Sequence, residues 1–219
     1  MSDLASAFAG LLTYHVATSA CPLPPASPGI TWIWAANGIF KRGVDRQLDA
    51  MVCVKRWPAG DIPGLASLMP YARWACWPGR LPGALLDPLL DNAVNAASDD
   101  GTVLRPIEKH YCFVRTASGI KLIAPVQQGT AGRVVYEPLP GTLCDIHSHH
   151  GMAAFFSATD DADDTGLSVS GVVGRIFEDP ELLVRINVYG HRQQVPALSI
   201  FDSLGPFRAK EWRYARADD

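Results

Sequence analysis

The chain has 219 residues, of which 48% are hydrophobic and 19% charged, with a formal net charge of −3. This composition is typical of a compact globular protein and excludes disorder, and the length is sufficient to bury a core. With no basic cluster and no apolar run near the roughly 20 residues of a membrane helix, neither nucleic acid nor a membrane is an expected partner. The start carries Asp3 and no positively charged stretch, so we interpret it as mature sequence and expect a cytoplasmic protein. Five scattered cysteines fit reduced thiols better than disulfides.

The first 80 residues have the features of a β-rich unit. Two β-prone runs in "ITWIWAANGIFKRGV" meet at Asn37-Gly38, a dipeptide typical of a two-residue hairpin turn. A further apolar strand, "AMVCV", follows, and the prolines and glycines after it exclude a long regular element. We therefore predict a β-rich and tryptophan-rich region over residues 1–80 and a second domain over residues 81–219.

The second region begins with a helix and continues with strands. Asp87, followed by proline, has the features of a helix N-cap, and apolar residues at helical spacing then predict a helix that ends near Ser98. Glycine and proline separate the β-prone segments that follow, from "IEKHYCFVRT" to "PALSIFD". The predicted fold class is α+β, with a mainly antiparallel sheet flanked by helices and a β-rich unit before it.

Three histidines within four positions end one of these strands, "TLCDIHSHH". Because side chains alternate along a strand, His147 and His149 should share one face, and Cys144 should lie on the other. Two imidazoles on one face can chelate a metal, and a catalytic zinc site needs three protein ligands and one open position. Asp160 follows after a loop long enough to fold back, so it is a chemically sound third ligand.

Two other interpretations compete with a metal site. A histidine pair with this spacing is often a satisfied polar patch. Ser157 and Asp160 also have the spacing of a helix capping box, but the following "DADDTG" lacks the apolar periodicity of a helix, which weakens that interpretation. A cation would relieve part of the repulsion within the aspartate run. We assign only Asp160 to the metal and expect most of these acids to be solvated.

The complete pattern, HxH, seven residues and then SxxD, resembles the motif of the JAB/MPN/Mov34 metalloproteases, called JAMM proteins. The resemblance implies a JAMM/MPN-like, cytidine-deaminase-like fold. It also implies that His147, His149 and Asp160 bind zinc and that Ser157 donates a hydrogen bond to the oxyanion. The family usually has proline after the second histidine, whereas this chain has His150, which leaves open a role as a spare ligand and the stiffness of the loop 151–156.

The family also places a glutamate on an earlier strand, after the first helix. Glu108 in "RPIEKHYCFV" matches that position better than its rival, Glu137, which lies too near the histidines in the sequence. The resemblance implies that Glu108 accepts a proton from the activated water and passes it to the leaving amine. From the sequence alone, the alternative is a solvated acid at a strand edge.

A closer likeness, strongest from Glu108 to Val188, is to the bacterial PRTRC system protein A family, through "APVQQG" and "HSHHGMAAFFSATDDADD". It implies a zinc-dependent peptidase or isopeptidase that processes or deconjugates a ubiquitin-like protein, with other PRTRC components as further partners. The substrate tail would lie extended beside "QQGTAGRVVYEPLPG". Two alternatives stay open, a non-catalytic MPN-type scaffold and a zinc hydrolase of a small amide.

Overall fold

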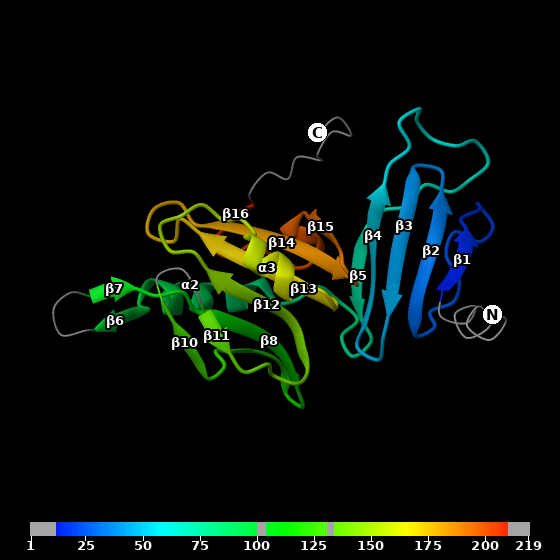
Figure 1. Ribbon diagram of the computed structural model, residues 1–219. Helices are drawn as coiled ribbons and strands as arrows, with labels where there is room; N and C mark the ends of the chain where they lie inside the picture. Colours follow the sequence, from blue (N-terminus) through cyan, green and yellow to red (C-terminus); the bar gives the residue numbers. More distant parts are fainter. Residues whose placement is uncertain (1–11, 100–103, 131–133, 210–219) are drawn as a thin grey trace, which may run out of the picture.

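The computed structural model of the protein describes residues 12–99, 104–130 and 134–209. Two β-sheets lie side by side, and the larger one carries the helices α2 and α3 (Figure 1). All five cysteines are free thiols, as expected. No helix in the described part of the chain has the length and hydropathy needed to cross a membrane. Residues 1–11, which contribute to the expectation of a mature start, lie outside the described ranges.

The first sheet has five strands in chain order, antiparallel except for the parallel pair β1 and β2. Its strands are β1 (Leu12–Val16), β2 (Gly29–Ala35), β3 (Gly38–Val44), β4 (Leu48–Lys55) and β5 (Tyr71–Trp74). The predicted hairpin is confirmed, but its turn residues are Ala36 and Asn37, because Ala35 pairs with Gly38. Gly38 lies so close to β4 that a Cβ there would overlap the carbonyl oxygen of Lys55.

The second sheet has the strand order β15-β14-β13-β12-β8-β9, and β16 pairs with β14. Only β12 with β13 and β14 with β16 are parallel, so the sheet agrees with the predicted α+β class. Its strands are β8 (His110–Thr116), β9 (Gly119–Ile123), β12 (Thr142–Ser148), β13 (Leu167–Gly174), β14 (Glu181–Val188), β15 (His191–Val195) and β16 (Arg208–Ala209). Two small antiparallel pairs accompany it, β6 (Ala97–Asp99) with β7 (Leu104–Pro106) and β10 (Gln127–Gly129) with β11 (Val134–Tyr136).

The first helix differs from its prediction at both ends. A 3-10 turn, η1 (Gly83–Leu85), runs into α2 (Leu86–Val94), so Asp87 lies within the first helical turn and is not the N-cap. The helix ends before the predicted Ser98, because that residue belongs to β6.

The last predicted strand is also wrong. The segment "PALSIFD" contains a 3-10 turn, η2 (Ala197–Ser199), and the strand before it, β15, has the sequence HRQQV. This strand lies at one end of the sheet order, and its mostly polar residues give no apolar alternation from which to predict it.

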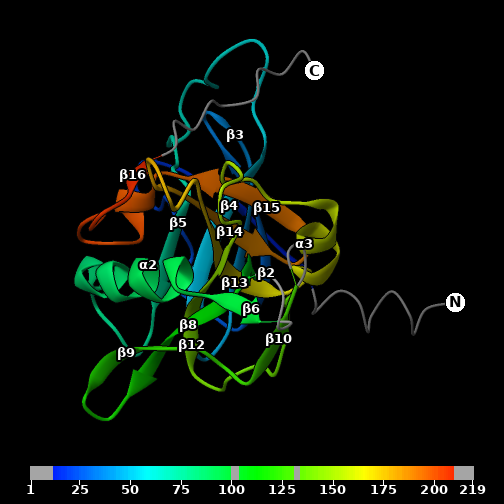
Figure 2. The ribbon, with the colours of Figure 1, turned by 90° about the vertical axis from the view of Figure 1, so that its left-hand side faces the viewer.

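The second sheet separates a core face from a polar face. Helix α2 packs on one face, and α3 (Ala158–Asp163) lies on the other (Figure 2). On the α2 side, Ile146 and Val184 belong to the main hydrophobic core. Their neighbours along the same strands, His147 and Arg185, point to the opposite face because side chains alternate. The candidate site therefore lies on the face that carries α3.

The main core extends into the first sheet. Leu48, Val52 and Trp74 of β4 and β5 belong to the same buried cluster as the central strands of the second sheet. The Trp74 indole Nε1 donates a hydrogen bond to the carbonyl oxygen of Leu143, at 2.9 Å. Lys41 Nζ donates to the carbonyl oxygen of Tyr189, at 2.7 Å. The two sheets thus pack directly on each other, and the predicted boundary near residue 80 stays a prediction.

Candidate metal centre

Strand β12 positions both histidines of the HxH pair. His147 is the last residue but one of β12, and His149 follows the strand. The His149 backbone N–H donates to the carbonyl oxygen of Val173, at 2.8 Å, and so holds the chain against β13 beyond the strand end. As a result, the two Nε2 atoms face each other at 3.1 Å. Cys144 lies in the core on the other face, as predicted.

Asp160 approaches these histidines from the first turn of α3. Its Oδ1 lies 3.4 Å from Nε2 of His147, and one ligand atom from each of the three residues lies within 4.8 Å of the others. Two ligands of one tetrahedral zinc, bonded at about 2.0–2.1 Å, lie about 3.3 Å apart. Two imidazoles and a carboxylate at the observed spacings therefore fit a zinc ion.

The same aspartate also completes a helix capping box. Ser157 Oγ accepts a hydrogen bond from the Asp160 backbone N–H at 3.2 Å, and Asp160 Oδ2 accepts one from the Ser157 backbone N–H at 2.6 Å. The sequence argument against a capping box was wrong, because α3 has only six residues and buries none of them, so it needs no apolar periodicity. One carboxylate oxygen caps the helix while the other faces the histidines, and the cap thus fixes the orientation of the ligand.

Glu108 lies just before β8 and lines the same cavity, of about 660 Å³, as His147, His149, Ser157 and Asp160. It is 5% exposed, and its backbone N–H donates to the carbonyl oxygen of Thr130, at 2.8 Å. Burial, with a contribution from Asp160, raises the pKa of Glu108 to about 7. The five residues predicted from the motif therefore meet around one cavity.

The rival glutamate does not reach this cavity. Glu137 is exposed, and it is not among the described residues that line the cavity, although its neighbours Tyr136 and Pro138 are. Its backbone N–H donates to the carbonyl oxygen of Val126, at 3.1 Å, which holds the chain next to β11.

The protonation of the histidine pair suits metal binding. Burial lowers the pKa of His147, and burial together with His147 lowers the pKa of His149 to about 4. A metal-binding imidazole must be neutral. Both rings can therefore offer a lone pair near neutral pH without first losing a proton.

His110 also lines the site, although the sequence analysis assigned it no role. It lies directly opposite His147 in the pairing of β8 with β12, lines the cavity and is 3% exposed. Its ring stacks on Tyr136 with 3.5 Å between centroids, and the Gln127 side chain bonds both its backbone N–H and its carbonyl oxygen. Within the described residues, His110 Nε2 has no hydrogen-bond partner. The alternation of Glu108 and His110 in the predicted strand "IEKHYCFVRT" was the available sequence signal.

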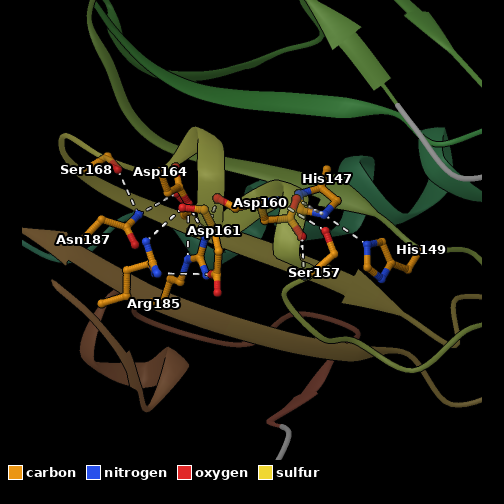
Figure 3. A network of polar contacts seen from close by, with 11 residues as sticks. His147, His149, Ser157, Asp160, Asp161, Asp164, Ser168, Arg185 and Asn187 are labelled. Atoms are coloured by element: carbon orange, nitrogen blue, oxygen red, sulfur yellow. Dashed lines mark hydrogen bonds and ion pairs between the residues drawn. The ribbon is translucent and has the colours of Figure 1, made fainter. Parts of the chain in front are cut away.

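The aspartate run is held by a buried arginine. Arg185 of β14 is 3% exposed and binds Asp161 Oδ1 at 2.5 Å and Asp164 Oδ2 at 2.7 Å (Figure 3). The expectation that most of these acids are solvated holds for the exposed Asp163 and for Asp161, whose side chain is 45% exposed, whereas Asp164 is largely covered. A single arginine within the apolar strand "ELLVRINVYG" was the signal that could have indicated this partner.

His150 does not join the three-ligand group found among the described residues. Its backbone has a φ of 48°, and its carbonyl oxygen accepts a hydrogen bond from the Ile176 N–H at 2.9 Å. Proline cannot adopt a positive φ. This backbone therefore accounts for the absence of proline after the second histidine.

The loop after His150 is anchored at its middle and apolar at its rim. Ala154 is fully buried, and its N–H donates to Glu181 Oε2 at 3.1 Å. Met152 and Phe155, on either side of it in the sequence, are exposed large hydrophobic residues that line the cavity. The loop therefore places two apolar side chains at the mouth of the site while its backbone is fixed at Ala154.

Comparison with known proteins gives one family. Residues 103–187 match a family model described as prokaryotic homologs of the JAB domain. A comparison with curated proteins finds no match. The matched segment contains Glu108 and the complete HxH and SxxD motif, which the fold brings to one cavity. Residues 103–187 therefore form a domain of the JAB type.

Proposed function

We propose that the protein is a zinc-dependent metallopeptidase or isopeptidase. The observation that carries the proposal is the meeting of three ligand atoms within 4.8 Å of one another, in a cavity that Glu108 and Ser157 also line. A domain of the JAB type is compatible with a hydrolase or with a binding scaffold. A scaffold, however, has no physical need for two neutral imidazoles and a carboxylate directed at one point.

Each residue of the site has a task in this proposal. His147, His149 and Asp160 would hold zinc, which when bound supplies Lewis-acid chemistry and lowers the pKa of water to about 7. Glu108, whose pKa burial raises to about 7, is suited to accept a proton near neutral pH and to pass it to the leaving amine. The Ser157 Oγ accepts the cap hydrogen bond, so its hydroxyl hydrogen is left to donate to the oxygen of the scissile carbonyl.

The proposed substrate is the C-terminal tail of a ubiquitin-like protein, bound in an extended conformation. Val134, Val135 and Tyr136 of β11 line one part of the cavity, and Met152 and Phe155 line another. An extended chain can pair with a strand edge through its backbone while its side chains rest on such apolar rims. The resemblance of the motif region supports three further parts of this proposal. The protein would act in a PRTRC-type system with other PRTRC components as partners, it would be cytoplasmic, and its topology would be cytidine-deaminase-like.

The test combines metal analysis with hydrolysis of a ubiquitin-like fusion protein. Protein purified without added zinc should contain one zinc per chain. Glu108→Gln should keep the zinc and lose about 10²–10⁴-fold in turnover, because proton transfer contributes a factor of this size. His147→Ala should lose both metal and turnover.

The other outcomes separate the alternatives. Wild-type protein without zinc would favour the scaffold. Cleavage of small amino-acid amides but not of the fusion would favour a small-amide hydrolase. Full turnover by Glu108→Gln would show that the base is another residue.

A further inference from the structure

We infer that Arg185 is a positioning residue for the ligand Asp160 and that it sets the zinc affinity of the site. The inference rests on the proposed zinc site. Arg185 reaches Asp160 at the backbone, where Nη2 donates to the carbonyl oxygen at 2.9 Å, and not at the carboxylate that faces the histidines. It would therefore act on the metal through the segment that carries Asp160.

The short helix α3 cannot hold Asp160 in place by itself. It has six residues, and none of them is buried. Helices of this length are not stable in isolation, because nucleation is costly and few hydrogen bonds follow it. The capping box orders the first turn, but it connects Ser157 and Asp160 only to each other. A contact with the sheet is needed to fix the helix relative to His147 and His149.

Arg185 supplies this contact along the whole segment. Beyond the Asp160 carbonyl oxygen, its guanidinium binds Asp161 Oδ1 within α3 at 2.5 Å and Oδ2 of Asp164, the C-cap residue, at 2.7 Å. Its Cζ also lies 3.9 Å from the ring centroid of Phe156, the residue before the N-cap. Figure 3 shows Arg185 with Asp161 and Asp164 beside the row formed by Asp160, His147 and His149.

The sheet makes Arg185 a rigid support. It lies in β14, paired with Ser170 of β13 on one side and with Gln194 of β15 on the other. Its side chain is 4% exposed, and a planar guanidinium with several charge-assisted bonds has little freedom to move. A buried arginine without partners would be strongly unfavourable, so the arginine and the acidic segment hold each other in place.

Charge and geometry make opposite predictions for the removal of Arg185. A positive charge near a zinc site repels the ion, so loss of the charge alone would strengthen zinc binding. Loss of the contacts between Arg185 and the segment that carries Asp160 would instead let Asp160 move away from the histidines and weaken zinc binding. Residues that orient metal ligands typically contribute about 10–100-fold to metal affinity. We therefore expect Arg185→Gln to weaken zinc binding by about this factor.

The experiment is a chelator competition that measures the zinc Kd of the full chain. Arg185→Gln removes both the charge and the contacts of the guanidinium, whereas Arg185→Lys keeps the charge but loses the planar guanidinium and its several hydrogen bonds. Arg192→Gln is the matched control, because Arg192 contacts Asp161 at Oδ1 and at the carbonyl oxygen but, within the described part of the chain, forms no hydrogen bond or ion pair with Asp160 or Asp164. Weaker binding in both Arg185 variants, with unchanged binding in Arg192→Gln, is expected.

Circular dichroism of the zinc-free proteins identifies the folded variants. If Arg185→Gln does not fold, Arg185→Lys alone decides. A folded Arg185 variant that binds zinc as tightly as the wild type, or more tightly, would overturn the inference while the proposed function stands. A wild-type protein that binds no zinc would overturn both.

Discussion

Replacing Asp160 by asparagine should separate the two tasks of one carboxylate. The amide oxygen of asparagine can still accept the hydrogen bond from the Ser157 backbone N–H, so the helix cap is kept. The negative charge that faces His147 is lost. Because burial lowers the pKa of His147, its ring is neutral at pH 7, and the 3.4 Å contact with Asp160 contributes little as an ion pair. The zinc-free protein should therefore tolerate the change.

The contacts of Asp160 and Ser157 predict how each substitution changes the free energy of unfolding with and without zinc. Without zinc, Asp160→Asn should unfold with a free energy within about 0.5 kcal/mol of the wild type, the range of a substitution that removes no buried contact. With free zinc at about 1,000 times its Kd, the wild type should gain about 4 kcal/mol, and Asp160→Asn should lose most of this gain. Ser157→Ala should show the reverse pattern, a loss of about 1 kcal/mol with and without zinc, because it removes the cap.

Urea denaturation in the presence of a chelator and in the presence of zinc measures all these quantities. An undiminished zinc gain in Asp160→Asn would show that this carboxylate is not a ligand. A loss of several kcal/mol in its zinc-free state would show that the charge, and not the cap, holds the segment.

Three further predictions concern the surroundings of the ligands. His150→Pro should destabilise the protein by about 3 kcal/mol or more, because proline cannot adopt the φ of 48°, whereas His150→Gly should unfold near the wild-type temperature in a thermal scan. His110→Phe should keep the stacking on Tyr136 and the zinc content but raise the KM for the fusion substrate, because it removes the ring nitrogens of a residue that lines the cavity. An unchanged KM would contradict this. Burial lowers the pKa of both histidines, that of His149 to about 4, so zinc affinity should fall less steeply between pH 7 and pH 5 than at a pair with the ordinary pKa of about 6.5. Such an ordinary pair would lose up to about 100-fold in affinity per pH unit below its pKa, and a loss of that size in chelator competition would contradict the prediction.

The sequence predicted the candidate ligands because their geometry is mostly local. His147 and His149 share a face through the alternation of one strand, and Ser157 and Asp160 lie within one helical turn. Glu108 needed the family resemblance, because it lies next to these residues only through the pairing of β8 with β12. Local spacing was thus sufficient for the three candidate ligands, whereas Ser157, like Glu108, took its role from the family resemblance.

The sequence could not indicate the supports of the site, which come from distant strands. Arg185 meets Asp161 and Asp164 across 24 and 21 positions of the chain, and no local pattern connects them. His110 lies beside His147 only because of the strand register. The sequence also could not decide between cap and candidate ligand for Asp160, since one oxygen of its carboxylate caps the helix while the other faces His147.

The shared packing of the two sheets has a practical consequence. Trp74 and its neighbours in β4 complete a cluster that also holds Ile146 and Val184, directly beneath the strands that carry the ligands. A fragment that starts at residue 81 would expose this hydrophobic cluster to water. It should therefore aggregate or unfold before it can bind a metal ion. A destabilising substitution in β4, none of whose residues lines the cavity, would then lower zinc binding in an assay just as the loss of a ligand would.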